Sequence, residues 1–127
     1  TRYIRVTGVQ TCALPIYLGD CDAYINVAGG MRINEPALDM GIVLAVLSSY
    51  KNIAIDSKTI CFGEVGLVGE VRAVNQAEQR VIEAAKLGFD RCIMPKVNCD
   101  SLNIDREQLK GMKLVGVKSI YELLEVI

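Results

Sequence analysis

The feature that most restricts the fold is an apolar run in the first half of the chain. Residues 37–50 read ALDMGIVLAVLSSY and follow Pro36, which suits the first turn of a helix. Apolar side chains lie on nearly every side of such a helix, so the sequence predicts a central helix that is buried all round. The longest apolar stretch, Met40 to Leu47, is far shorter than the roughly 18 residues that cross a bilayer. We therefore expect no membrane span.

Short strands and helices alternate along the rest of the chain. Alternating or β-branched runs bounded by Gly or Pro predict strands at 22–28, 31–33, 59–62, 70–74, 91–94 and 113–117. The polar stretch 98–110 is expected to be a loop with one helical turn. The predicted order, ββαββαβ(α)βα, is typical of a mixed α/β (α+β) domain with one core. The expected architecture is a mixed sheet with a buried central helix and flanking helices.

Two further helices carry start signals. Asn75 followed by Glu78, and Ser119 followed by Glu122, have the spacing of capping boxes. The first of these helices places small apolar residues on one face and ends at Gly88, while the second runs to Val126. The face consists of Ala77, Val81, Ala84 and Ala85.

The composition excludes several kinds of chemistry. The 14 basic and 15 acidic residues nearly balance, which argues against a polybasic nucleic-acid binder, although a local patch remains possible. The chain has no His, so Ser-His-Asp, Cys-His and His-ligated zinc sites are excluded within it. The five cysteines form no C-x-x-C pair, so we expect no metal site and free thiols instead.

The opening segment is expected to differ in origin from the remainder. Residues 6–16, VTGVQTCALPI, resemble the translation of a sequencing-library adapter. This resemblance implies that residues 1–17 are a non-native segment and that residues 18–127 are a domain from the C-terminal part of a longer protein. We therefore leave residues 1–17 out of the fold prediction.

Four motifs then occur in order along the chain. They are NVAGGMRINEPALD (26–39), FGEVGLVGEVRAV (62–74), AEQRVIEAAKLGF (77–89) and LVGVKSI (114–120). Together they resemble the Lon-protease-like domain, in the form found at the C-terminus of the bacterial RadA (Sms) family of DNA repair proteins. The resemblance covers nearly all of residues 22–124.

The resemblance also identifies the positions of a peptidase dyad. Active Lon proteases use a Ser after a Gly-Pro pair and a Lys near the start of the next helix, where the amine activates the hydroxyl. In this sequence Ala37 and Glu78 occupy those two positions. We therefore expect no catalytic, cofactor-binding or metal-binding residue in this chain. The alternative, a Lon-type Ser-Lys peptidase or an inactive substrate-binding relative, lacks its key residues.

The RadA-type resemblance implies a non-catalytic module of a DNA-dependent ATPase. Such a parent acts as a branch-migration motor in recombinational DNA repair, assembles as a homo-hexameric ring and works in the cytoplasm. ATP, Mg and Zn would bind in a P-loop ATPase and a zinc ribbon that lie outside this chain. The expected partners are duplex or branched DNA, other copies of the chain and other recombination proteins. Arg32 and Arg72, each near a turn, are our candidates for DNA contact.

Overall fold

Three parallel strands form the centre of the molecule. The computed structural model describes residues 2–6, 23–27 and 34–127. In it, β3 (Thr59–Cys61), β6 (Arg91–Pro95) and β7 (Lys113–Val117) pair in the order β3-β6-β7. Parallel pairing needs long crossovers, which contain α2 (Ala77–Lys86) in one case and α3 (Lys96–Ser101) with α4 (Arg106–Leu109) in the other. The predicted strands at 59–62, 91–94 and 113–117 are confirmed.

Two antiparallel hairpins accompany this sheet. β1 (Arg2–Val6) pairs with β2 (Ala23–Val27), and β4 (Glu64–Val65) pairs with β5 (Val71–Arg72). The predicted strand at 22–28 is therefore confirmed, while that at 31–33 lies outside the described residues. The expected strand at 70–74 is shorter than predicted. Whether residues 1–17 are native stays a prediction.

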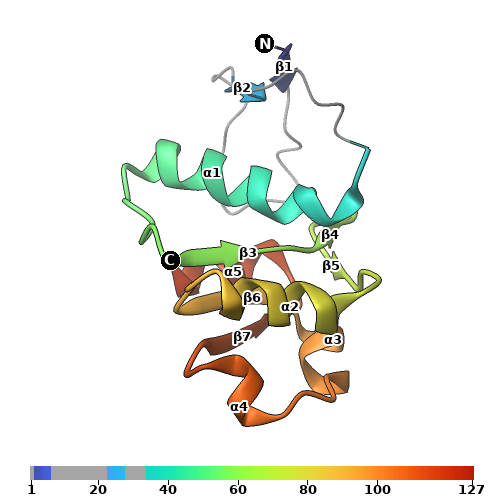
Figure 1. Ribbon diagram of the computed structural model, residues 1–127. Coiled ribbons are helices and arrows are strands. Elements are labelled where there is room, and N and C mark those ends of the chain that lie inside the picture. Colours follow the sequence, from blue (N-terminus) through green and yellow to red (C-terminus); the bar gives the residue numbers. More distant parts are fainter. Residues whose placement is uncertain (1, 7–22, 28–33) are drawn as a thin grey trace.

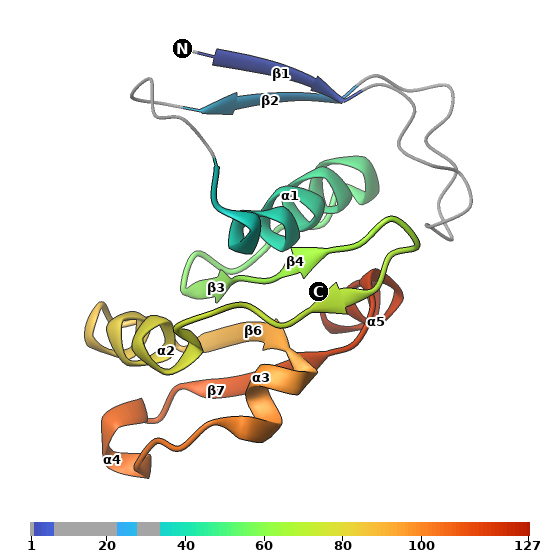
Figure 2. The ribbon, with the colours of Figure 1, turned by 90° about the vertical axis from the view of Figure 1, so that its right-hand side faces the viewer.

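Helices cover both faces of the parallel sheet (Figure 2). α2 (Ala77–Lys86) and α5 (Ile120–Val126) lie on opposite sides of it, and α1 (Asp39–Lys51) follows a short 3-10 turn at Pro36–Leu38. Alternate residues of the central strand β6 divide the core. Ile93 packs with the α1 and α5 side, whereas Cys92 and Met94 pack with the α2 side. The mixed α/β architecture expected from the sequence is confirmed.

The helix at 37–50 is correctly predicted, but its complete burial is wrong. Only Met40, Leu44 and Leu47 of α1 are buried, while Ala45 and Ser49 are exposed. Figure 1 shows the reason, since α1 lies along one side of the described core instead of passing through its middle. A helix in that place buries one stripe and leaves the opposite stripe open.

The segment 98–110 is more ordered than the predicted loop. It forms two short helices, α3 (Lys96–Ser101) and α4 (Arg106–Leu109). Gln108 helps to start α4, because its side-chain oxygen accepts a hydrogen bond from the Asp105 N–H. α3 lies so close to β7 that a Cβ on Gly116 would come within 2.9 Å of the Lys96 side chain. α3 therefore packs closely against β7.

The β4–β5 hairpin is attached to the start of α5. The Val71 N–H donates to the Lys118 carbonyl at 2.8 Å, and the Ile120 N–H donates to the Gly69 carbonyl at 2.9 Å. Ser119 caps α5 by accepting from the Glu122 N–H, as its sequence pattern predicts. The Glu122 carboxylate accepts from the Lys118 N–H, one residue earlier than in a capping box. The hairpin and the start of α5 consequently form one hydrogen-bonded unit.

Candidate functional site

Ala37, at the position of the missing nucleophile, is enclosed by the core. Only 2% of it is exposed, and it packs in the cluster that contains Phe62, Ala77 and Val81. Its carbonyl accepts from the Gly63 N–H at 2.8 Å. A methyl group cannot attack a carbonyl carbon, and this one fills space between the start of α1 and α2.

Glu78, at the position of the missing base, forms a contact on another side of α2. Its Oε1 accepts from the Asn103 N–H at 3.0 Å, which fixes the connection between α3 and α4. The predicted capping box is wrong, because the residue before α2 is Gln76 in the left-handed conformation and no side chain caps it. Glu78 still lies in the first turn of α2, where its charge suits the helix dipole.

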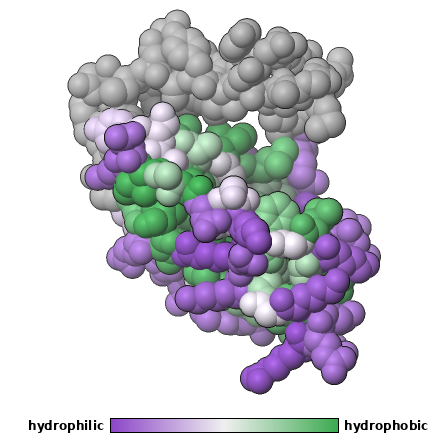
Figure 3. Space-filling model, turned by 60° about the vertical axis from the view of Figure 1, so that its left-hand side comes forward, coloured by the Kyte–Doolittle hydropathy of each residue, from purple (hydrophilic) through white to green (hydrophobic). Residues whose placement is uncertain are grey.

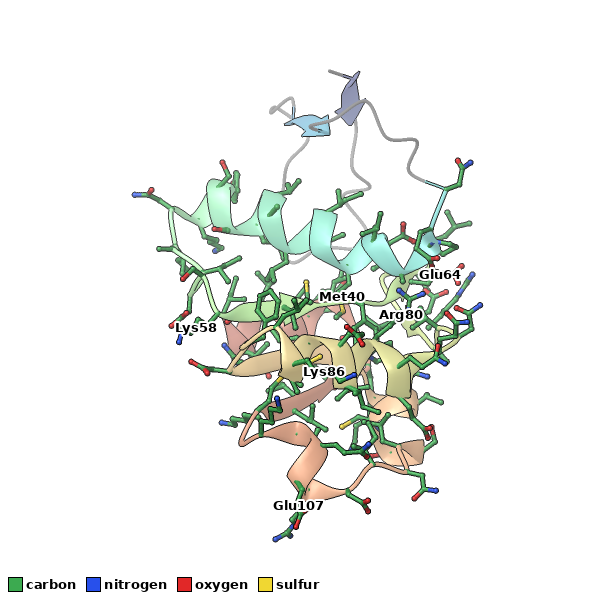
Figure 4. All side chains as sticks on the ribbon, viewed as in Figure 1. Met40, Lys58, Glu64, Arg80, Lys86 and Glu107 are labelled. Atoms are coloured by element: carbon green, nitrogen blue, oxygen red, sulfur yellow. The ribbon has the colours of Figure 1, made fainter. Side chains whose placement is uncertain are left out.

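A pair that the sequence analysis missed lies beside Ala37. Glu35 Oε1 accepts from the Ala37 N–H at 3.2 Å, and the same oxygen is 3.3 Å from the Arg80 guanidinium. Arg80 also lies over the Phe62 ring and donates to the Asn75 carbonyl at 3.1 Å. Figure 4 shows Arg80 on α2, close beneath α1. Arg stays protonated in proteins, so this group cannot act as a general base.

An open cleft of about 360 Å³ lies next to Glu78, at the start of α2. Asn98 on its floor is 9% exposed and bonds Val74 twice: its amide nitrogen donates to the Val74 carbonyl, and its oxygen accepts from the Val74 N–H. Ser101 donates to the Asn98 carbonyl. The lining Asn and Ser side chains therefore already have partners within the fold. The cleft is lined by Val74, Gln76, Ala77, Glu78, Gln79, Asn98, Ser101 and Leu102.

The thiols of the core are not arranged for chemistry. Burial raises the pKa of Cys61 to about 11 and that of Cys92 to about 12, so both stay protonated near neutral pH. Among the described residues, no cluster of Cys, Asp and Glu could hold a metal ion.

Arg72, a predicted DNA contact, is held between two carboxylates. Its guanidinium is 2.7 Å from Glu70 and 3.6 Å from Glu64, its neighbour across the hairpin. A backbone hydrogen bond and the Arg72 contact lower the pKa of Glu70, and Glu70 in turn raises the pKa of Arg72. The positive charge of Arg72 is largely offset. Arg32 lies outside the described residues.

Several other bases gather where the parallel strands begin. Lys58 immediately precedes β3, and Arg91 and Lys113 are the first residues of β6 and β7. Asp90 lies among them, 3.9 Å from the Lys58 amine, and its carbonyl accepts from the Lys113 N–H. Lys51 and Lys86 are the last residues of α1 and α2, where cations suit the helix dipole. We call this end of the molecule the amino edge. No described helix is long and apolar enough to cross a membrane.

Comparison with known protein families identifies the type of domain. Residues 18–98 match the family model described as "Subunit ChlI of Mg-chelatase", a Lon-like type of domain. This match covers more than half of the chain, so the protein belongs to that family of Lon-like domains.

Comparison with individual proteins identifies the form of the domain more narrowly than the family model does. The chain is 45% identical over 105 residues to a DNA repair protein RadA of Halalkalibacterium halodurans, covering 83% of this chain and 22% of the relative. It is 44% identical over 109 residues to the RadA protein of Bacillus subtilis, covering 86% and 23%. For the RadA protein of Aquifex aeolicus the identity is 41% over 126 residues, covering 99% and 27%. The predicted resemblance to the RadA form of the domain is confirmed, and the chain spans about a quarter of each relative.

Proposed function

We propose that this chain is the non-catalytic Lon-like domain of a RadA-type DNA repair protein, and that it serves ring assembly and contact with duplex DNA. The observation that carries this proposal is the state of the dyad positions. Ala37 is buried against Phe62, Glu78 binds the Asn103 N–H, and a permanently charged guanidinium lies beside Ala37. The arrangement supports a structural role for a region that would be catalytic in a peptidase.

The activity of the whole protein belongs to the parts outside this chain. We propose that the parent is a DNA-dependent ATPase that drives branch migration in recombinational repair, in the bacterial cytoplasm. ATP and Mg would bind in its ATPase part and Zn in a separate zinc ribbon. A homo-hexameric ring, with duplex or branched DNA and other recombination proteins as partners, completes this proposal.

Contact with DNA would depend on a few basic residues in each subunit. Lys110 and Lys113 flank the turn before β7 and form no ion pair with a described carboxylate, so we add them to Arg32. Arg72 is a weaker candidate than these three, because Glu64 and Glu70 offset its charge. With basic and acidic residues nearly balanced, one subunit neutralises few phosphates. Repetition around a ring turns later contacts into intramolecular ones and raises the overall affinity.

Fluorescence anisotropy with a duplex at two salt concentrations tests this function. We expect weak, salt-sensitive and sequence-independent binding by this chain, and much tighter binding by the full-length parent. In the parent, Lys110→Glu with Lys113→Glu should weaken binding and reduce its salt dependence, as should Arg32→Glu. Lys96→Glu, at a base already paired with Asp100 at 2.7 Å, is the matched control. Tight, salt-insensitive binding by this chain would contradict the argument. If none of these substitutions of basic residues changed the affinity for DNA, the domain would serve as a scaffold only.

The peptidase alternative is less well supported. It would need a nucleophile within reach of a base, and three of the described Ser residues have other partners. Ser101 donates to the Asn98 carbonyl, Ser48 donates to the Ile53 carbonyl and Ser119 caps α5. We therefore keep the DNA-repair function as the conclusion.

A further inference from the structure

The tip of the β4–β5 hairpin exposes two apolar side chains. Leu67 is 78% exposed and Val68 73% exposed, at the two central positions of a turn closed by a hydrogen bond from the Gly69 N–H to the Gly66 carbonyl. Gly, Asn, Asp and Ser usually occupy such positions. The turn geometry does not favour Leu and Val, and burial within this chain does not explain their presence either.

This tip is held in one conformation. The Glu70 carboxylate accepts from the Val68 N–H at 3.1 Å, while the Gly66 N–H donates to the Glu70 carbonyl at 2.8 Å. The bond from the Ile120 N–H to the Gly69 carbonyl fixes the hairpin to α5. Leu67 and Val68 are therefore presented on a rigid support, as an anchor for a partner requires.

The charges around the tip indicate the kind of partner. Glu64 and Glu70 flank the hairpin and exceed the single charge of Arg72, so a phosphate backbone is a poor match. A partner surface with an exposed apolar side chain and neighbouring basic residues would match both the apolar tip and the two carboxylates beside it.

Such a surface occurs at the amino edge of the same molecule. Leu87, just after α2, is 73% exposed and follows Lys86. Lys58 is near the same loop, because its carbonyl accepts from the Asp90 N–H. Asp90 and Glu83 pair with Lys58 and Lys86, and Lys113, whose N–H donates to the Asp90 carbonyl, leaves one positive charge in excess there. Lys58 and Glu64 lie at opposite sides in Figure 4, and Figure 3 shows hydrophobic and hydrophilic residues side by side when the left-hand side of Figure 1 comes forward. A molecule cannot bring these two surfaces of its own fold together, but two copies can.

We propose that the tip Leu67–Val68 of one copy docks on the Leu87 surface of the next, with Glu64 and Glu70 facing the group of Lys58, Lys86 and Lys113. The two surfaces differ, so the contact is heterologous and repeats head to tail until it closes as a ring. This inference rests on the ring assembly proposed above and names the surfaces that form it.

Cross-linking between two variants tests the contact. A chain with Leu67→Cys and a second chain with Leu87→Cys are mixed and treated with a short bifunctional maleimide. We expect a covalent dimer that joins position 67 of one copy to position 87 of the other, identified by mass spectrometry, in the mixture and not in either variant alone. The unsubstituted chain is the control for its own cysteines. The same pair of variants in the full-length parent should behave alike.

Each outcome decides for or against the inference. A link between two positions 67 in the first variant alone would show a two-fold contact and overturn it. Assembly without a link between positions 67 and 87 would also overturn it, while leaving the proposed ring in place. Leu67→Ser with Val68→Ser should weaken self-association about tenfold, in line with the loss of a central anchor. Duplex binding by an unassembled single copy should not change, which separates this inference from the proposed DNA contact.

Discussion

The hairpin tip lies between the dyad positions Ala37 and Glu78 in the sequence, but the side chains of the two regions have different surroundings. Around Ala37 and Glu78, each charged side chain described above binds another part of the fold: Glu35 binds Arg80, and Glu78 binds Asn103. At the tip, Leu67 and Val68 have most of their surface in solvent.

This difference indicates which region faces a partner. A site that has lost its chemistry can be absorbed into the fold, because every contact made inward stabilises the domain. Exposed Leu and Val contribute nothing to that stability and cost solubility. We therefore expect side-chain contacts in the dyad region to contribute to the free energy of unfolding, and the tip side chains to contribute almost nothing.

The largest expected effect comes from Asn98, on the floor of the cleft. Asn98→Ala leaves the Val74 N–H and carbonyl without their partner, which costs about 1–3 kcal/mol for each group that stays unpaired. The free energy of unfolding, measured with urea, should fall by that amount. Asn103→Ala is the matched control, since Glu78 binds the backbone of Asn103 and not its side chain. If Asn98→Ala and Asn103→Ala lowered the free energy of unfolding equally, the Asn98 side chain would have no special role in stability.

A smaller loss is expected at the pair beside Ala37. Arg80→Met removes the contact with Glu35 and the stacking over Phe62, and should cost about 1 kcal/mol. Arg106→Met, at an exposed base on α4, should leave the unfolding midpoint nearly unchanged. If both substitutions had the same effect, the Arg80 contacts would not be important for stability.

At the tip, almost no change in stability is expected. Leu67→Ser with Val68→Ser should alter the free energy of unfolding by no more than about 0.5 kcal/mol, because both side chains are already largely in water. Val81→Ala, at a position with 0% exposure, should cost several times more. A large loss from the tip substitutions would remove the contrast between the two regions.

No peptidase activity is expected from this chain or from a variant with Ala37→Ser and Glu78→Lys. The variant lacks a preorganised oxyanion site and substrate groove, and Arg80 still lies beside position 37. Casein and fluorogenic peptides are suitable substrates. Turnover by the unsubstituted chain that persists after removal of contaminating proteases would refute the non-catalytic assignment.

The sequence predicted local structure better than contacts between distant segments. The buried face Ala77, Val81, Ala84 and Ala85 followed from helical spacing, and the motif order identified Ala37 and Glu78. The Glu35–Arg80 pair joins residues 45 positions apart, so no local pattern indicates it. Asn98 was missed because a buried Asn in a polar stretch looks like a loop residue. The pairing of Arg72 with Glu64 had a signal, since the glycines at 66 and 69 fix the register of the hairpin.

The attachment of the hairpin to α5 has a consequence for the entropy of association. A free loop with two apolar residues would lose conformational freedom whenever a partner ordered it, and this loss would cancel much of the gain from a small contact. Here the backbone bonds of Val68 and Gly69 order the tip before any encounter. Two side chains on such a preordered support can therefore contribute most of their desolvation free energy to binding, even though their area is small.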